Sequence, residues 1–346
     1  MMRKNSRPTL REIASAAGTS IATASNVISG KKTKFVSDRL KRKVLEAAER
    51  LNYSPTQLAR AVHGKRRHVV AVLVPELHNA VLMRMMQGAQ SVASDRGYLI
   101  LICSTLRDPA KEEGYIQSLM AEGVDGFLIG VTLEGTESVQ KLQMLEIPYV
   151  VLDREFPSVF PYDSVGYDDA QAVFLAVRHL YDMGHRKICY MGYATEDMAR
   201  RNEYFRKACH ELKLEDKDCP VQLGLLGKEE GERLLDTCVQ HFRSSALVIG
   251  SHLIGEDVIR TRRLKGVSVP EDISVVVVGN PIWTDMAGPG FTAVELPHPD
   301  MGSMGMTMLI DRIEGSKSPK RSLKLDCSLV VRASVKDVNG KMEEIE

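Results

Sequence analysis

Apolar residues along most of the chain form short continuous runs that alternate with longer amphipathic segments. The run VVAVLV at 69–74 is followed by a helical segment that ends near Gly97, and then by the run YLILIC at 98–103. Runs that are apolar throughout are typical of strands in a parallel sheet, because helices cover both faces of such a sheet. Further runs lie at 124–130, 149–153, 187–191, 246–250 and 273–278. The pattern predicts an α/β body of parallel sheets with right-handed crossovers, in which ligands bind near the carboxyl ends of strands.

The first 54 residues follow a different pattern, in which apolar residues recur at helical spacing. Thr9 and Glu12 stand three residues apart and predict a capping box at the start of a first helix. Gly18 provides a turn, and Ser20 and Ser37 are suited to cap a second and a third helix. The apolar positions expected to face inward are Leu10, Ile13, Ala14, Ala17, Ala24, Val27, Ile28, Leu40, Val44, Ala48 and Leu51.

Two short helices joined by a glycine turn are typical of a helix-turn-helix unit. In such a unit the second helix enters the major groove of DNA while the first supports it. An ordinary small helical bundle would show the same spacing, since the motif A-x-x-A-G-x-S at 14–20 is short. The spacing alone leaves both interpretations open.

Charge separates these two parts of the chain. Over the whole chain, 46 Lys and Arg residues nearly balance 45 Asp and Glu residues. Residues 1–68 hold 16 of the basic and 4 of the acidic side chains, a net charge of +12, which leaves 30 basic and 41 acidic side chains, a net charge of −11, for residues 69–346. A basic unit attached to an acidic body is expected of a chain in which one part alone neutralises phosphates.

Cysteine usage and hydropathy favour a cytoplasmic protein. No two cysteines form a C-x-x-C pair, and some lie in apolar runs, so we expect reduced core residues. The six cysteines are Cys103, Cys189, Cys209, Cys219, Cys238 and Cys327. Residues 1–8 are polar and basic without an apolar stretch of signal-peptide length, and no later segment approaches a membrane span. We therefore expect no membrane partner.

Sequence motifs of enzyme chemistry are absent. There is no G-x-x-x-x-G-K loop, no G-x-S-x-G elbow, no H-E-x-x-H pair and no G-x-G-x-x-G after a strand. The nine histidines show no metal-ligand spacing. We expect a protein that is not an enzyme and holds no cofactor or metal. A transport-type ligand-binding protein is an alternative, but it would carry a signal peptide and no basic head.

Longer motifs resemble one known family in their order along the chain. Residues 9–30 (TLREIASAAGTSIATASNVISG) and 36–66 (VSDRLKRKVLEAAERLNYSPTQLARAVHGKR) are similar to the DNA-binding head and hinge of the lactose and galactose repressor family. The resemblance continues to about residue 335, through V-x-V-P at 72–75, V-D-G at 124–126, L-D-R at 152–154, G-H-R-K-I at 184–188 and V-P-E-D-I-S at 269–274. It implies a sequence-specific DNA-binding transcriptional regulator, with repression as the default sign.

The resemblance implies that Ile21, Ala22 and Asn26 of the second helix face base edges. Ile21 and Ala22 offer apolar contact, which suits thymine methyl groups, whereas Asn26 can bridge N6 and N7 of adenine. Many family members carry arginine where Asn26 stands, and arginine favours guanine. We therefore expect an operator half-site that differs from theirs at that base pair.

Other head residues would contact the DNA backbone or bend the duplex. Phosphate contact or support of the register is implied for Ser20, Thr23, Ser25, Lys31, Lys32 and Lys34. Further DNA contacts are implied for Thr9, Tyr53, Thr56, Ala59, Arg60 and His63. Residues 55–62 correspond to a hinge helix that folds with its dimer mate against the minor groove. Val62 stands where the family usually has leucine, so we expect a shallower kink.

The resemblance also implies the domain boundaries. A helix-turn-helix domain would span 1–54, a hinge and linker 55–68, a two-lobed body 69–337 and a tail 338–346. The first lobe would hold about 69–164 and 296–322, and the second about 165–295 and 323–337. Each would be Rossmann-like, as in periplasmic sugar-binding proteins, with an effector in the cleft between them. The tail shows no heptad pattern, so a homodimer is expected rather than a tetramer.

Cleft positions can be carried over onto this sequence. They are Asn79, Leu82, Asp153, Arg154, Arg201, Leu226, Ser251, His252, Pro281 and Trp283. Where many members have N-D this chain has Ser251 and His252, and where they have G-F-D-D it has G-N-P-I at 279–282. Two acidic acceptors for sugar hydroxyls are therefore missing. The small-molecule effector is expected to be a sugar, a sugar derivative or an anionic metabolite.

Several alternatives remain open at the cleft. Arg154 and Arg201 are suited to pair an anionic ligand, but arginines at a lobe surface are also common salt-bridge partners. His252 is either a ligand group or a histidine satisfied by backbone, and Trp283 lines the cleft or packs a loop. A regulator of the same fold controlled by a protein partner, or by no ligand, is the alternative function.

Overall fold

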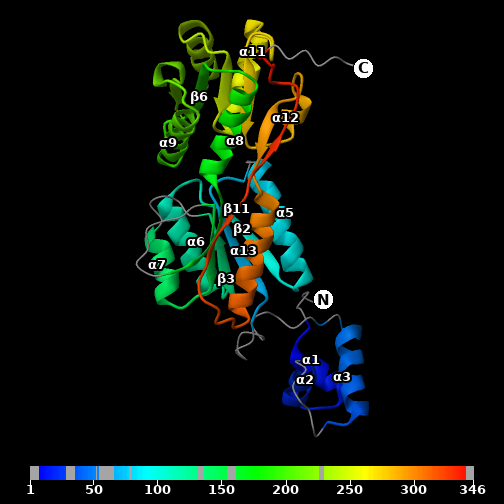
Figure 1. Cartoon of the computed structure of the whole chain (residues 1–346). Coiled ribbons are helices and arrows are strands. Elements are labelled where there is room, and N and C mark those ends of the chain that lie inside the picture. Colours follow the sequence, from blue (N-terminus) through cyan, green and yellow to red (C-terminus); the bar gives the residue numbers. More distant parts are fainter. Residues whose placement is uncertain are drawn as a thin grey trace. The chain divides into compact units, whose positions relative to one another are not determined.

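The structure is a computed structural model of the chain and describes residues 8–28, 36–51, 53, 66–77, 80–130, 136–153, 161–225 and 230–339. The chain divides into two compact units, Met1–Arg67 and His68–Glu346 (Figure 1). The boundary falls within the predicted hinge and linker. In the described parts, no helix has the length and apolar character needed to cross a membrane.

Three short helices make up the described part of the first unit. They are α1 (Leu10–Ala17), α2 (Ile21–Ile28) and α3 (Asp38–Arg50). The predicted capping box is confirmed, because the Thr9 N–H donates to Glu12 Oε2 at 2.7 Å and the Glu12 N–H donates to Thr9 Oγ1 at 3.4 Å. Gly18 adopts φ +65°, a left-handed conformation that glycine reaches without strain and that lets the chain double back. The cap predicted at Ser37 is confirmed too, since its Oγ accepts from the Leu40 N–H at 3.4 Å.

One hydrophobic cluster lies between these helices. Its buried members are Ile13, Ala14, Ala17, Ala24, Val44 and Ala47. Alanine dominates because short side chains let α1 and α2 approach closely. The inward positions predicted from spacing belong to this cluster or pack against it, except Leu10, which is half-buried outside it.

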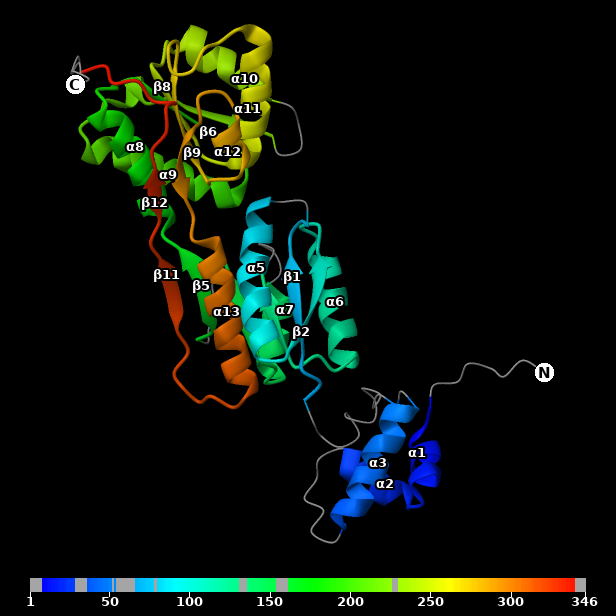
Figure 2. The same cartoon turned by 90° about the vertical axis from the view of Figure 1, so that its right-hand side faces the viewer.

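A six-stranded parallel sheet forms the first lobe of the second unit, in the order β11-β5-β4-β3-β1-β2. Its strands are β1 (Val69–Val74), β2 (Leu99–Ser104), β3 (Gly126–Ile129), β4 (Tyr149–Leu152), β5 (Asp163–Tyr167) and β11 (Ser322–Leu325). Helices α5 (Ala80–Asp95) and α13 (His298–Ile313) cover one face of this sheet (Figure 2), and their apolar residues belong to the core on that face. Those of α6 (Pro109–Ala121) and α7 (Thr136–Met144) pack on the other.

The second lobe is built on another six-stranded sheet, in the order β12-β10-β9-β8-β6-β7. Its strands are β6 (Ile188–Tyr193), β7 (Val221–Gly224), β8 (Ala246–Ile249), β9 (Ser274–Val278), β10 (Thr292–Glu295) and β12 (Ser328–Val330). All pairs are parallel except β10 with β12. The flanking elements are α8 (Asp169–Asp182), α9 (Glu196–Glu211), the 3-10 turn at Asp216–Asp218, α10 (Gly231–Asp236), the π-helical turn at Thr237–His241, α11 (His252–Lys265) and α12 (Trp283–Met286).

The predicted α/β class and the apolar strands are confirmed, but two of the crossings between the lobes lie later than the lobe boundaries that the resemblance implies. β5 continues the first sheet to Tyr167, and β11 continues it to Leu325. The expected crossings near 164 and 323 therefore fall inside strands of the first lobe. The pattern misses these strands because β5 begins with the charged Asp163 and β11 carries Lys324, whereas the recognised strands are apolar throughout.

Candidate functional site

The exposed face of α2 carries the residues predicted to face base edges. Ile21 is 44% exposed, and Ala22 and Asn26 are exposed too. Ala24 lies on the opposite side and is fully buried in the head core, which holds the helix in place. The exposed face thus combines apolar groups with one side-chain amide, a chemistry suited to thymine methyl groups and an adenine edge.

Hydroxyl groups at the start of α1 and α2 stabilise the helix ends. Ser20 Oγ accepts from the Thr23 N–H at 3.1 Å and lies 2.9 Å from Thr23 Oγ1. Thr9 Oγ1 donates to Glu12 Oε2 at 3.1 Å. Ser25 is half-buried on α2. Fixed helix starts present backbone N–H groups that favour anions such as phosphate.

Tyr53 packs against the head core rather than standing free of it. Its N–H donates to the Ala48 carbonyl at 2.8 Å, and its ring contacts the cluster of α1, α2 and α3. Burial raises the pKa of its hydroxyl. The position supports the exit of the chain from α3, and contact of Tyr53 with DNA stays a prediction.

Several predicted site residues lie outside the described part of the chain. In the head and hinge these are Lys31, Lys32, Lys34, Thr56, Ala59, Arg60, Val62 and His63. In the body they are Asn79, Arg154 and Leu226. Their roles stay as the sequence predicts them.

Asn26→Ala is expected to reduce discrimination at one base pair of each half-site by about 1–3 kcal/mol, because the amide is the only bidentate group on the exposed face of α2. Lys32→Ala is expected to weaken binding to all sequences alike, since a phosphate contact carries no sequence information. Fluorescence anisotropy with matched and single-mismatch duplexes measures both effects. The reverse pattern would show that the two roles are assigned wrongly.

Arg201 on α9 lies buried where elements of both lobes meet. Its Nε donates to Asp169 Oδ1 at 2.6 Å and its Nη1 to the Gly250 carbonyl at 2.7 Å. Its Nη2 donates to the hydroxyl of Tyr167, at the end of β5 in the first sheet. Gly250 follows β8 of the second sheet, so a single guanidinium joins the carboxyl ends of strands from both sheets.

The charge of Arg201 is balanced by Asp169. Burial alone would lower the pKa of the guanidinium, but the Asp169 carboxylate together with Tyr167 and Tyr190 outweighs burial and holds the pKa well above its usual value. Of the two interpretations left by the sequence, the salt-bridge partner is thus the one that the described contacts support. A ligand at this place meets a neutral ion pair rather than an isolated positive charge.

Two uncharged histidines lie near this arginine. Burial, reinforced by the charge of nearby groups including Arg201, lowers the pKa of His252 to about 4. Burial lowers the pKa of His298 to about 4 as well, and its ring lies 5.8 Å from that of Tyr167. Both imidazoles are therefore neutral near pH 7 and present hydrogen-bonding nitrogens without charge.

His298 is a site residue that the sequence reasoning missed. It begins α13, directly after the lobe boundary at 295 that the resemblance implies. The segment L-P-H-P at 296–299 puts a histidine at this boundary, which could have marked it as a site residue. The residues before it do not form a long apolar run, so the sequence did not show that a strand ends there. Its nearness to Tyr167 depends on strands that the pattern did not predict.

Two of the other predicted cleft residues, Asp153 and Ser251, lie at a pocket and at the start of a helix, whereas the rest pack within the lobes. Asp153 lines a pocket that is open to solvent, together with Tyr167, Asp169 and Arg200. Ser251 caps α11, accepting from the Leu253 N–H at 3.4 Å.

Leu82 and Trp283 pack against the cores of the first and second lobes, respectively. The Trp283 ring meets Phe291 edge-on with ring centroids 6.0 Å apart, and Pro281 is buried nearby in the chain. No described contact brings Trp283 to Arg201, so the loop-packing interpretation is the one its contacts support.

A second bridge between the lobes was not predicted. Arg84 on α5 of the first lobe lies 2.8 Å from Glu295 Oε1 at the end of β10 in the second. The other oxygen of Glu295 accepts from Asn280 Nδ2 at 2.7 Å. Asn280 stands where many members of the family have the phenylalanine of G-F-D-D, and its amide donates to Glu295 where a phenylalanine could not.

Comparisons with known proteins agree with this architecture. The model of the lacI family of bacterial regulatory proteins matches residues 9–56, and that of the periplasmic binding protein-like domain matches 177–335. The HTH-type transcriptional regulator DegA of Bacillus subtilis is 30% identical over 347 residues, covering 96% of this chain and 99% of that relative. The HTH-type transcriptional repressor PurR of Photobacterium profundum is 27% identical, covering 96% and 99%.

Solved structures are similar along nearly the whole chain. The lac repressor dimer bound to operator and the anti-inducer ONPF has a TM-score of 0.83 at 21% identity, covering 96% of this chain and 100% of that one, which shows the fold. The complex of the transcriptional regulator CelR with cellobiose has a TM-score of 0.69 at 26% identity, covering 95% and 100%. From its helix-turn-helix head to its two-lobed body, this chain belongs to the lacI family and is a DNA-binding transcriptional regulator.

Proposed function

We propose that this regulator is a repressor that binds a pseudo-palindromic operator as a homodimer and responds to a small-molecule effector between its lobes. The observation that carries the effector site is Arg201, whose guanidinium joins Tyr167 of the first lobe to Gly250 of the second. A ligand that changes these hydrogen bonds would shift one lobe relative to the other. Such differential contact is what couples a ligand to a two-state protein.

The surroundings of Arg201 favour an uncharged, hydrogen-bonding ligand over an anion. Asp169 already balances the charge of Arg201, and His252 and His298 are neutral near pH 7. The solved complex of CelR holds cellobiose, an uncharged sugar. A sugar or sugar derivative therefore fits the site better than an anionic metabolite.

Exposed apolar side chains support the homodimer. β2 is an edge strand of the first sheet, and it exposes Leu99 by 64%, Leu101 by 42% and Ile102 by 42%. In the second lobe, Ile282 and Met286 are each 76% exposed. Apolar groups on an uncovered strand edge invite association, and a second copy of the chain is the partner that brings two heads to one operator.

One observation favours the alternative of a regulator that needs no small molecule. The Arg84–Glu295 ion pair joins the lobes without any ligand, and the Asn280–Glu295 hydrogen bond within the second lobe holds Glu295 in place for it. The exposed fractions of the pair, 42% for Arg84 and 24% for Glu295, leave it partly screened by water, so it contributes at most about 1 kcal/mol. An effector that binds tightly would outweigh it.

Thermal-shift screening of the full chain tests the effector directly. Against uncharged sugars, sugar phosphates and nucleobases, we expect an uncharged sugar or sugar derivative to raise the melting temperature and to change the affinity for DNA. At a hundredfold excess over its Kd, a ligand adds about 2.7 kcal/mol to the free energy of unfolding.

A pair of variants places the ligand. Tyr167→Phe removes the hydroxyl that accepts from Arg201 and is expected to raise the Kd of the ligand by about threefold to tenfold. Tyr115→Phe, on the exposed surface of α6, is expected to leave binding unchanged. If no ligand of these classes alters both stability and DNA affinity, the effector does not exist as proposed and the alternative stands.

A further inference from the structure

The segment 314–321, between α13 and β11, forms an exposed basic loop in an otherwise acidic body. Residues 69–346 carry 30 basic and 41 acidic side chains. The sequence E-G-S-K-S-P-K-R at 314–321 holds Lys317, Lys320 and Arg321 against the single acidic Glu314, and all of its residues are exposed. The loop therefore departs from the charge of the body that surrounds it.

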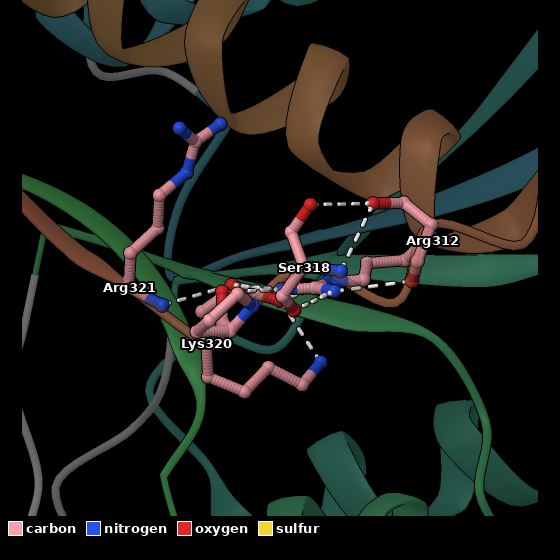
Figure 3. A network of polar contacts seen from close by, with 7 residues as sticks. Arg312, Ser318, Lys320 and Arg321 are labelled. Atoms are coloured by element: carbon pink, nitrogen blue, oxygen red, sulfur yellow. Dashed lines mark hydrogen bonds and ion pairs between the residues drawn. The ribbon is translucent and has the colours of Figure 1, made fainter.

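Arg312 at the end of α13 holds the loop in one conformation. Its Nη1 donates to the carbonyls of Ser316 at 3.1 Å and Ser318 at 2.5 Å, and its Nη2 donates to that of Pro319 at 2.9 Å. The same guanidinium binds the buried Asp163 at 2.8 Å and 3.1 Å (Figure 3). A loop whose carbonyls converge on one arginine presents its other side chains at defined places.

One of the loop's cations is neutralised by a buried acid. Lys320 Nζ lies 2.9 Å from Asp163 Oδ2, and Asp163 is also bound by Arg312. The acidic groups next to the loop are engaged elsewhere, because Arg96 lies 3.2 Å from Asp311 and 2.6 Å from Glu314. These acids therefore do not cancel the remaining charges of the loop.

Lys317 and Arg321 are the cations that remain available to an external partner. Within the described parts of the chain, neither side chain makes a hydrogen bond or an ion pair. Arg321 takes part in the network only through its backbone N–H, which donates to Asp163 Oδ1 at 3.1 Å. Figure 3 shows its guanidinium extended away from Arg312 and Lys320.

The sheet topology places this loop at a particular edge of the first lobe. β11 and β1 belong to one parallel sheet, so their strands begin at the same end of the sheet. The residues that precede β11 therefore lie at the same end as the residues that precede β1. The chain enters β1 at Val69, directly after the linker from the helix-turn-helix head. The basic loop thus lies at the edge of the body where the DNA-binding part of the chain is attached.

We propose that the loop 314–321 binds the DNA backbone through Lys317 and Arg321, outside the bases that the head reads. Ammonium and guanidinium groups bind phosphate oxygens through charge-assisted hydrogen bonds and release counterions, without regard to sequence. The body then adds affinity and salt dependence to the complex but no specificity. An acidic protein surface is the competing kind of partner.

The test compares Lys317→Ala/Arg321→Ala with the charge-matched control Lys111→Ala/Arg206→Ala in the full-length protein. Lys111 begins α6 at the opposite edge of the first sheet, and Arg206 lies on α9 of the second lobe. The probes are duplexes of arbitrary sequence with about 40 and about 16 base pairs, because phosphate contacts need no operator. Both double variants remove two exposed cations, so melting temperatures are expected to stay unchanged.

On the long duplex, the loop variant is expected to lower the slope of log Kobs against log[salt] by about 2 per chain and to weaken binding about tenfold in 0.1 M salt. The control variant is expected to change neither by more than about a fifth of that amount. On the short duplex, the loop variant is expected to behave like the wild type. Unchanged binding on the long duplex would overturn the proposal and favour a protein partner. An equal loss on both duplexes would overturn the placement outside the bases read by the head.

Discussion

Replacing Asp163 with asparagine is expected to lower the free energy of unfolding by about 3–5 kcal/mol at pH 7. Asp163 is 1% exposed and accepts hydrogen bonds from Arg312, Lys320 and the backbone N–H of Arg321. An asparagine of the same size leaves Arg312, whose side chain is 11% exposed, as a buried charge without a carboxylate. It also loosens the loop 316–319, whose carbonyls Arg312 binds.

The effect of Asp163→Asn is expected to depend on pH. Burial alone would raise the pKa of Asp163, but the hydrogen bonds from Arg312 and Lys320 outweigh burial and hold the pKa below its usual value. A carboxylate whose pKa is depressed by folding stabilises the protein above its unfolded pKa of about 3.9, and this contribution is lost as the pH falls through the folded pKa. The difference between wild type and variant should therefore be full at pH 7 and shrink below about pH 4.

Urea unfolding followed by circular dichroism measures this difference. Asp311→Asn is the matched control, because Asp311 lies on the same helix as Arg312 and pairs with Arg96, but it is 43% exposed. Its loss is expected to cost less than about 1 kcal/mol. Equal effects of the two substitutions would show that the Asp163 network does not stabilise the fold.

Gly302→Ala is expected to destabilise the first lobe by about 3 kcal/mol, although it adds one methyl group. A Cβ at 302 would lie 1.8 Å from the Met85 carbonyl oxygen, and one at Gly88 would lie 2.0 Å from that of Pro299. These two glycines allow α5 and α13 to cross with their backbones in contact. Because both obstacles are backbone atoms, no side-chain rotation relieves the clash, and the helices must separate.

Gly114→Ala is the control with the opposite sign. Gly114 lies inside α6, and a Cβ there would meet no atom within 4 Å. Alanine is expected to stabilise the protein by about 0.5–1 kcal/mol, through its higher helix propensity and the reduced freedom of the unfolded chain. Thermal unfolding of both variants separates the crossing from the general cost of replacing glycine. A Gly302→Ala variant with the same melting temperature as the wild type would contradict the close contact between the backbones of α5 and α13.

The local features of the head could be predicted from sequence because their causes are local. The Thr9–Glu12 capping box and the Ser37 cap join residues three apart, and Gly18 needs only its own conformational freedom. The apolar strands of the body could be predicted for a similar reason, since each is recognised by its own residues. The family resemblance then supplied what spacing alone left open, the difference between a DNA-binding head and a plain helical bundle.

The contacts that shape the interlobe site join residues far apart in the chain, and no local pattern indicates them. Arg84 and Glu295, which join the lobes, are 211 residues apart, and Asp163 and Arg312, at the opposite end of the first sheet, are likewise 149 apart. Strand β5 escaped recognition because its first residue is charged, and its charge is acceptable only because Arg312 lies beside it. Arg201 could be named as a site residue, but its neutralisation by Asp169 depends on how α8 and α9 pack.

The most direct test of the central claim, that α2 reads operator sequence for a dimeric regulator, is selection of bound duplexes from a randomised pool by the full-length protein. We expect an enriched motif of two inverted half-sites. Asn26→Ala should lose preference at one position of each half-site while the other positions keep theirs. Absence of an enriched motif, or the same motif from wild type and Asn26→Ala, would contradict the reading of bases by this face of α2.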